Sequence, residues 1–175
     1  ILVVVIVTLL LLGCSPNTET ANDSKRPEAL DTIAGTERET SRPGAGGIHL
    51  GMSLEKAKGL YPEATFREVP VFEYGVDGEE SGVLIEIHGA PLLFVYTQEE
   101  RDAIAGISVL SPTLSVGKNI RTGMTAMEFL ERYPHAQFEI DVIDEGIEFG
   151  YIKDEAFRVE FLTTDSTRVG QYETS

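Results

Sequence analysis

Apolar and polar residues alternate along short runs through most of the second half of the chain. In 137–143 and 157–162, apolar side chains fall at every second position, with charged residues between most of them. This period of two is typical of strands that bury one face of an antiparallel sheet. Turn residues such as 144–146 separate the runs. The predicted strands cover 66–74, 83–88, 92–97, 104–110, 137–143, 147–152, 157–162 and 168–172.

Two further segments, 54–61 and 126–133, place their apolar residues at the spacing of one helix face. Ser53 and Thr125 precede these segments and are predicted N-caps, because a hydroxyl oxygen there accepts a hydrogen bond from a free amide of the first turn. Residues 125–128 also match a capping box. The sequence therefore predicts two short helices.

Both helices belong to an internal repeat with an offset of 72 residues. Segments 48–66 and 120–138 share seven identities over 19 positions, whereas chance gives about one. The glycine before each cap is predicted to allow a tight or positive-φ turn, and the proline after each helix is predicted to end it. The repeated motif consists of Gly51, Met52, Ser53, Tyr61 and Pro62 in the first copy, and Gly123, Met124, Thr125, Tyr133 and Pro134 in the second. We expect the tyrosines to pack in the core; the alternative is that they are exposed interface anchors.

These elements predict an α+β fold. We expect two tandem repeats, each a helix followed by four strands, to form an antiparallel sheet with the helices packed on one face. The first repeat would span 48–117 and the second 118–175, and 48–175 would be one compact domain.

The amino-terminal residues 1–12 are almost entirely apolar. Twelve helical residues span roughly 18 Å, which is too short to cross a hydrocarbon core of about 30 Å. The length fits the apolar region of a secretory signal peptide, and we expect residues 1–13 to be one.

The end of this segment, Leu11-Leu12-Gly13-Cys14, resembles the lipobox of bacterial lipoproteins. The resemblance implies that the Cys14 thiol carries a diacylglycerol, that cleavage occurs just before it and that the new amino terminus is acylated. Ser15, in place of an aspartate, implies a position at the outer membrane, facing the periplasm. Cys14 is the chain's single cysteine, so no disulfide is expected in the domain. Residues 14–47 show no period of 3.6 or 2 and predict a lipidated, disordered tether.

The Gly-Met-Ser/Thr helix starts within these units resemble small envelope lipoproteins, including the β-lactamase-inhibitor-protein-like fold and the SmpA/OmlA outer-membrane-assembly lipoproteins. The segment 104–112 with Ile120, Gly123 and Met124 is also similar to an RpoE-regulated lipoprotein family of unknown function. Activity does not transfer from a fold, so these resemblances imply an architecture and a location.

The formal charge of −15 argues against nucleic-acid binding, which depends on clustered Lys and Arg. The three histidines lie in different predicted elements and lack metal-site spacing. No nucleophile elbow or phosphate loop is present. The sequence therefore predicts no catalytic residue, metal or cofactor, and no enzyme. Acidic clusters at 77–80 and 141–148 carry the oxygen ligands that Ca²⁺ prefers, but neither has EF-hand spacing. We expect both to be solvated hairpin turns.

We therefore expect a non-catalytic envelope lipoprotein that acts as a protein-binding or scaffolding module, anchored to the membrane through Cys14 and engaging an envelope protein partner. The alternative is a lipoprotein that binds a small ligand or a cation.

Overall fold

The chain folds into a mostly β structure, seen in a computed structural model that describes residues 7–10, 44–98, 101–153, 155–164 and 166–170. Among the described residues, strands account for 41% and helices for 15%. The two α-helices have seven residues each: α1 spans Leu54–Leu60 and α2 spans Ala126–Arg132. The predicted α+β class with two helix-then-four-strand repeats is therefore wrong.

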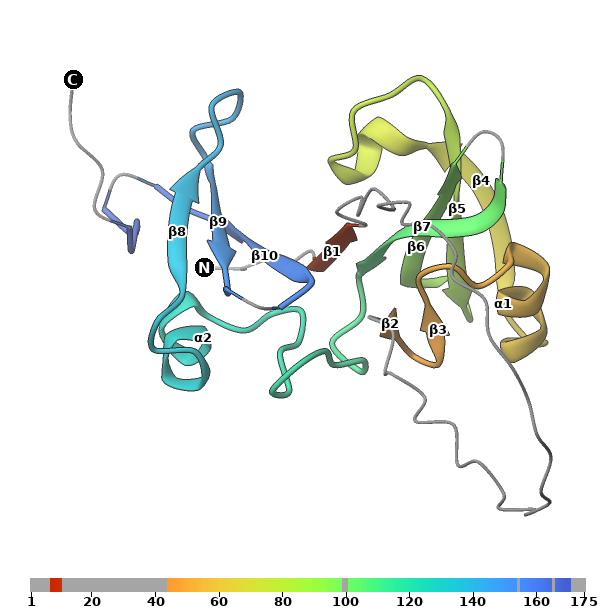
Figure 1. The fold of residues 1–175 in the computed structure, drawn as a ribbon, viewed down its shortest axis with the longest axis horizontal. Coiled ribbons are helices and arrows are strands. Elements are labelled where there is room, and N and C mark those ends of the chain that lie inside the picture. The colour runs from red at the N-terminus through yellow and green to blue at the C-terminus, as the bar shows by residue number, and fades with distance from the viewer. Residues whose placement is uncertain (1–6, 11–43, 99–100, 154, 165, 171–175) are drawn as a thin grey trace, which may run out of the picture.

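The strands form one large antiparallel sheet in the order β4-β5-β6-β7-β1-β10-β9-β8. Strand β1 joins a four-stranded set, β4 to β7, to a three-stranded set, β8 to β10, and Figure 1 shows it between the two. The bounds are β1 Val7–Leu10, β4 Thr65–Pro70, β5 Ser81–Ile87, β6 Ala90–Gln98, β7 Arg101–Val109, β8 Gln137–Ile140, β9 Ile147–Tyr151 and β10 Phe157–Leu162.

Residues 44–109, with α1 and β4 to β7, form the first unit, and residues 116–170, with α2 and β8 to β10, form the second. A small hairpin precedes each helix. In the first unit, β2 (Gly44–Ala45) pairs with β3 (Ile48–His49), and in the second a single bridge joins Val116 to Ile120. The predicted caps are confirmed: Ser53 accepts from the Lys56 amide, and Thr125 and Glu128 form the full capping box. The predicted positive φ is also confirmed, at 80° for Gly51 and 89° for Gly123.

Each unit locks its helix to its hairpin through a tyrosine hydroxyl. The Tyr61 hydroxyl donates to the Gly46 carbonyl, and the Tyr133 hydroxyl accepts from the Lys118 amide at 2.9 Å. In both cases the backbone partner lies 15 residues earlier, so the repeated sequence also repeats this contact. Burial raises the pKa of the Tyr133 hydroxyl; the Lys118 amide opposes the rise, and the nearby Glu155 adds to it. The hydroxyl thus stays protonated and donates to Glu155 at 3.2 Å.

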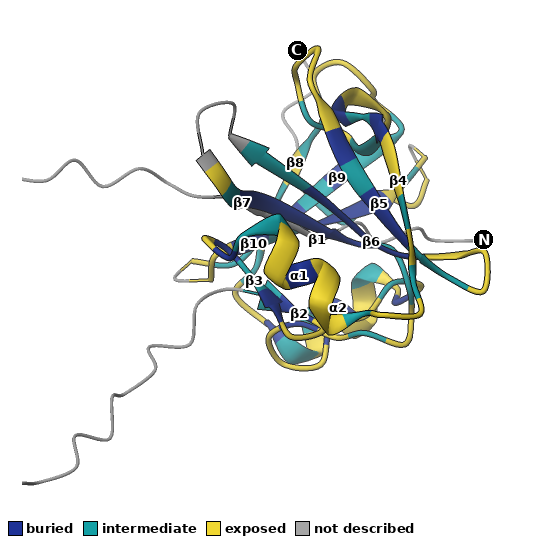
Figure 2. Ribbon diagram, turned by 90° about the vertical axis from the view of Figure 1, so that its right-hand side faces the viewer, coloured by how far each residue is buried: buried dark blue, intermediate teal, exposed yellow. Residues whose placement is uncertain are grey.

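The main core lies between one face of the sheet and the two helices. Ala57 of α1 and Phe129 of α2 are fully buried in it, and both helices show their exposed side to solvent (Figure 2). The Phe129 ring packs at 5.5 Å, centroid to centroid, from Phe161 of β10. A side chain at Gly150 would lie 2.8 Å from the Phe129 ring, so this glycine makes room for the helix.

A smaller core lies on the opposite face, in the first unit. There the 3₁₀-helix η1 (Val71–Tyr74) covers β5 and β6. The Tyr74 ring stacks on Phe94 with a centroid distance of 4.3 Å. The predicted strand 66–74 therefore ends at Pro70, and its remainder forms this cover.

The second unit has three strands of its own because the predicted strand at 168–172 does not form over residues 168–170. The backbone amides of Val169 and Gly170 donate instead to the buried carboxylate of Glu148, at 3.1 and 2.6 Å. A carboxylate on β9 thus satisfies amides that a neighbouring strand would otherwise have bonded.

The segment 1–13, expected to be a signal peptide, contributes β1, and its other residues lie outside the described part. The tether expected at 14–47 is described from Gly44 onward, where β2 already begins. Cys14 lies outside the described residues. Among those that are described, no helix is long and apolar enough to cross a membrane.

Replacing Phe129 with alanine should lower the free energy of unfolding by about 3–5 kcal/mol, because it removes a fully buried ring and leaves a cavity. Met127→Ala, on the exposed side of the same helix, is the matched control and should change the value by less than about 0.5 kcal/mol. Urea denaturation of both variants measures the difference. Equal effects would show that α2 does not pack as described.

Candidate binding cleft

The outer face of the second unit's sheet has no cover equivalent to η1. Phe149 and Tyr151 of β9 and Arg158 of β10 lie half-buried on this face, opposite the helices. Their rings and charges correspond in position to the face that η1 covers in the first unit. The second unit therefore presents an aromatic and charged sheet surface with nothing packed over part of it within the described residues.

This surface forms the floor of a cleft of about 540 Å³. One wall is η1 with the loop after it, and the other is the β8–β9 hairpin. The lining residues are Phe72, Gly75, Val76, Asp77, Glu139, Ile140, Asp141, Val142, Ile143, Asp144, Ile147, Phe149, Tyr151, Arg158 and Glu160. The cleft thus draws its walls from both units.

Exposed apolar side chains stand at both rims of the cleft. Phe72 is 65% exposed on one side, and Val142 and Ile143 are 92% and 87% exposed at the tip of the hairpin. Single exposed apolar residues are ordinary, whereas clustered ones at a groove mark interaction sites. A partner that covered these three side chains would remove their apolar surface from water, which favours association.

The hairpin tip is held in shape by its own aspartates. The Asp141 carboxylate accepts from the amides of Ile143 and Asp144, at 2.7 and 3.1 Å, and the Asp144 carboxylate accepts from the Gly146 amide at 2.8 Å. Aspartates commonly hold turns in this way. The acidic cluster predicted at 141–148 therefore builds the turn that presents Val142 and Ile143.

The cleft is predominantly acidic. Five of its lining residues are Asp or Glu, and Arg158 is the single Lys or Arg among them. The Arg158 guanidinium lies 4.3 Å from the Phe149 ring centroid and 3.3 Å from the Glu160 carboxylate, so it is already engaged. The remaining negative charge suits a partner segment that carries Lys or Arg.

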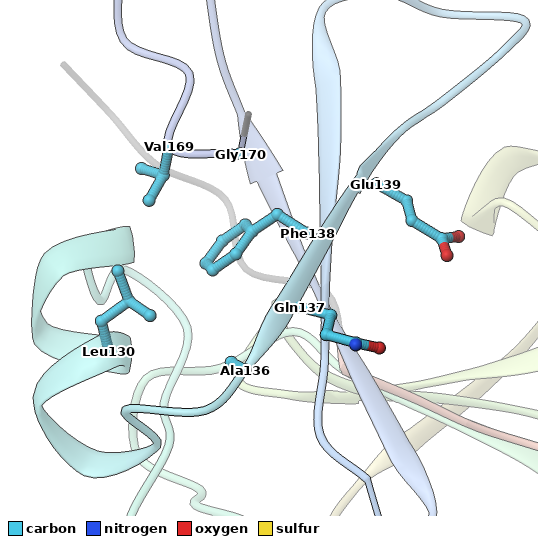
Figure 3. Close-up of a pocket in the computed structure, with 7 residues that line it drawn as sticks. All are labelled: Leu130, Ala136, Gln137, Phe138, Glu139, Val169 and Gly170. Atoms are coloured by element: carbon cyan, nitrogen blue, oxygen red, sulfur yellow. The ribbon is translucent and has the colours of Figure 1, made fainter. Parts of the chain in front are cut away.

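A second hollow, of about 510 Å³, lies between α2, β8 and the segment at 169–170. Figure 3 shows Leu130, Phe138 and Val169 directed into it, while Gln137 and Glu139 project from the other side of β8. Among its described lining residues, Glu139 has the one ionisable side chain.

The histidines stay apart in the fold. His49 lies in β3 with its ring within 3.1 Å of the Leu50 carbonyl, His88 lies in the β5–β6 turn and His135 follows α2. Within the described ranges, no three His, Cys, Asp or Glu side chains are close enough to hold a metal ion. The acidic cluster at 77–80 lies in the loop after η1, and Glu148 of the other cluster is buried against the amides of Val169 and Gly170.

The repeat motif does not form the cleft. Met52 and Met124 are buried, the tyrosines hold the hairpins and Ser53 and Thr125 cap the helices. Tyr133 is in the core as expected, and Tyr61 is partly buried and packs against the core. The sequence analysis identified Asp77, Asp141 and Asp144 only as members of acidic clusters and did not predict the cleft. A signal that could have indicated it is the apolar pair Val142-Ile143 beside these acidic residues.

Comparison with known protein families, with curated proteins and with solved structures finds no match to this chain. The resemblances to envelope lipoproteins and to inhibitor-like folds therefore stay predictions.

The Glu148→Gln variant should weaken the hold on residues 169–170, because glutamine keeps one uncharged accepting oxygen where the carboxylate offers two charged ones to the amides of Val169 and Gly170. Hydrogen exchange of these two amides should become faster, while exchange in β4 and β5 stays unchanged. Glu139→Gln, an exposed glutamate of the same hairpin, is the control. Unchanged exchange at Val169 and Gly170 would refute this role for Glu148.

Proposed function

We propose that this chain is a lipid-anchored, non-catalytic envelope protein whose domain binds a basic, partly apolar segment of another envelope protein. The observation that supports the proposal most directly is the acidic cleft with exposed apolar rims. Phe72 stands on one rim and the Val142-Ile143 pair on the other, so one bound segment would touch both units.

The chemistry of the cleft favours a peptide-like partner over a small ligand. The cleft is open, its walls are loops and hairpins, and its polar groups are spread along it instead of converging on one point. Arg158 lies against Phe149 and Glu160 and so cannot act as a free anion-binding group without breaking those contacts. Apolar rims around a charged groove suit a segment with apolar anchors and basic residues between them.

The anchor is proposed from the sequence of residues 11–14. Each buried methylene contributes about 0.8 kcal/mol, and one acyl chain alone binds a bilayer marginally, so stable anchoring needs more than one chain. A diacylglycerol on the Cys14 thiol with an acylated amino terminus provides three. The residues between Cys14 and Gly44 would then separate the lipid from the folded domain.

The proposed lipid anchor can be tested by mass spectrometry. Mass spectrometry of the wild-type chain should show a polypeptide that begins at Cys14 and carries acyl groups. Cys14→Ala should abolish both the lipid and the cleavage, because the thiol is the acceptor. Cys14→Ser keeps the size of the side chain but has no thiol, so it should lose the lipid and the cleavage in the same way. Wild-type protein that retains residues 1–13 and carries no lipid would disprove the anchor.

The cleft predicts a contact. A photo-crosslinking amino acid at position 143 should trap an envelope protein in intact cells, because this position is 87% exposed at the rim. The same amino acid at position 127 is 64% exposed on α2 and is the matched control. The adduct at 143 should be lost when Val142→Ser and Phe72→Ser are added. An identical adduct pattern at both positions, or none at 143, would refute the cleft as the docking site.

A further inference from the structure

Strand β1 fills a slot between β7 and β10 by pairing with both neighbours. Val7 is opposite Val109 and Val159, Thr8 is opposite Ser108 and Arg158, and Leu9 is opposite Ile107 and Phe157. Three successive residues thus have a partner on each side. This is the pairing of a central strand, in which both rows of backbone groups are satisfied.

Comparison of the two units explains why β10 has an edge that pairs with a further strand. In the first unit β6 pairs with β5 on one side and with β7 on the other. In the second unit β10 pairs with β9 on one side, and β1 takes the place on its other side. The second unit's own candidate for this place, residues 168–170, is bound to Glu148 instead. Among the described residues, the fourth strand of the second unit comes from the other end of the chain.

The slot is lined for an apolar strand. On β7, Ile107 and Val109 are 0% and 1% exposed, and on β10 Val159 is 0% exposed. These side chains lie on the face that the helices cover. A strand that enters here has one face against the main core, and its two edges are bonded to β7 and β10.

This arrangement conflicts with the processing proposed above, on which the present inference rests. Cleavage before Cys14 removes Val7–Leu10 from the mature protein. The edges of β7 and β10 would then both lose their partner, and unpaired edges beside buried apolar residues readily recruit another strand.

We propose that the slot between β7 and β10 is a strand-binding site of the mature protein. Its occupant is an extended, apolar, proline-free segment of an envelope protein that adds as a central strand. Residues 7–10 fill the slot in the precursor and keep it closed until the leader is removed. Recognition rests on main-chain hydrogen bonds to two edges at once, with apolar side chains directed at the core.

The chemistry of the slot defines which segment it accepts. Every backbone amide of a central strand has a partner, so proline is excluded. The positions opposite Ile107 and Val109 require apolar side chains, because these neighbours are buried in the main core. The position opposite Ser108 pairs with Thr8 in the register of β1 and β7. A run of Val, Ile, Leu and Thr such as residues 5–10 meets these requirements.

The test uses the processed, lipid-bearing chain in detergent micelles. The probe is a synthetic peptide with the sequence of residues 5–12, extended by lysines at both ends for solubility. The control peptide carries proline in place of the threonine at position 8. Hydrogen exchange with mass analysis follows the amides of β7 and β10, and β4, at the outer edge of the sheet, serves as the internal reference.

The probe should slow exchange in β7 and β10 at least tenfold and leave β4 unchanged, and the proline peptide should have no effect. In the unprocessed Cys14→Ala chain the same amides should be protected without added peptide, because β1 occupies the slot. No added protection in the processed chain, or equal protection by the two peptides, would overturn the proposal. The mass of the same sample distinguishes a failure of the proposed processing from a failure of strand binding. If residues 1–13 are retained, the processing does not occur. The slot is then permanently filled by β1, which also overturns the proposal.

Discussion

Backbone hydrogen bonding at the junction of the two units is the constraint on which the rest of the structure depends. The four-stranded and three-stranded sets each end in an edge, at β7 and β10, and β1 satisfies both edges at once. The two units also share one main core, and η1 and the β8–β9 hairpin face each other across the cleft. In the pairing of the described strands, the two sets are joined through the strand that occupies this junction, which is β1 here and, by our proposal, a bound strand after processing.

The two units begin alike and diverge after their helices. Hairpin, positive-φ glycine, capped seven-residue helix and tyrosine contact recur in both. The connection between the first two strands does not: in the first unit it forms η1 and covers the sheet, whereas in the second it is a turn of aspartates that leaves Phe149 and Tyr151 half-buried. The proposed binding surface lies where one copy lacks a cover that the other copy has.

Local rules sufficed where the relevant partners are near in sequence. The sequence predicts Ser53 and Thr125 as caps because each accepts a hydrogen bond from the amide only three residues later. The prolines predict the helix ends because they act on the residue directly before them. Non-local competition explains the failures. Residues 168–170 have a strand-like pattern, but Glu148, about 20 positions away, binds the amides of Val169 and Gly170. Residues 7–10 have the composition of a signal peptide and also that of a buried strand, and composition alone does not separate the two. The cleft depends on the approach of η1 to a hairpin some 70 residues later, which no local pattern encodes.

The position of β1 in the sheet also determines when it can fold. Val7 pairs with Val159, 152 positions later in the chain. Contacts between residues so far apart form late, since the closure of a long loop must precede them. During synthesis the first segment therefore emerges long before its neighbour β10 exists. If the segment is the signal peptide that we propose, it is exposed to the export machinery during that interval, and it can join the sheet only if it is still attached when the last strand is complete.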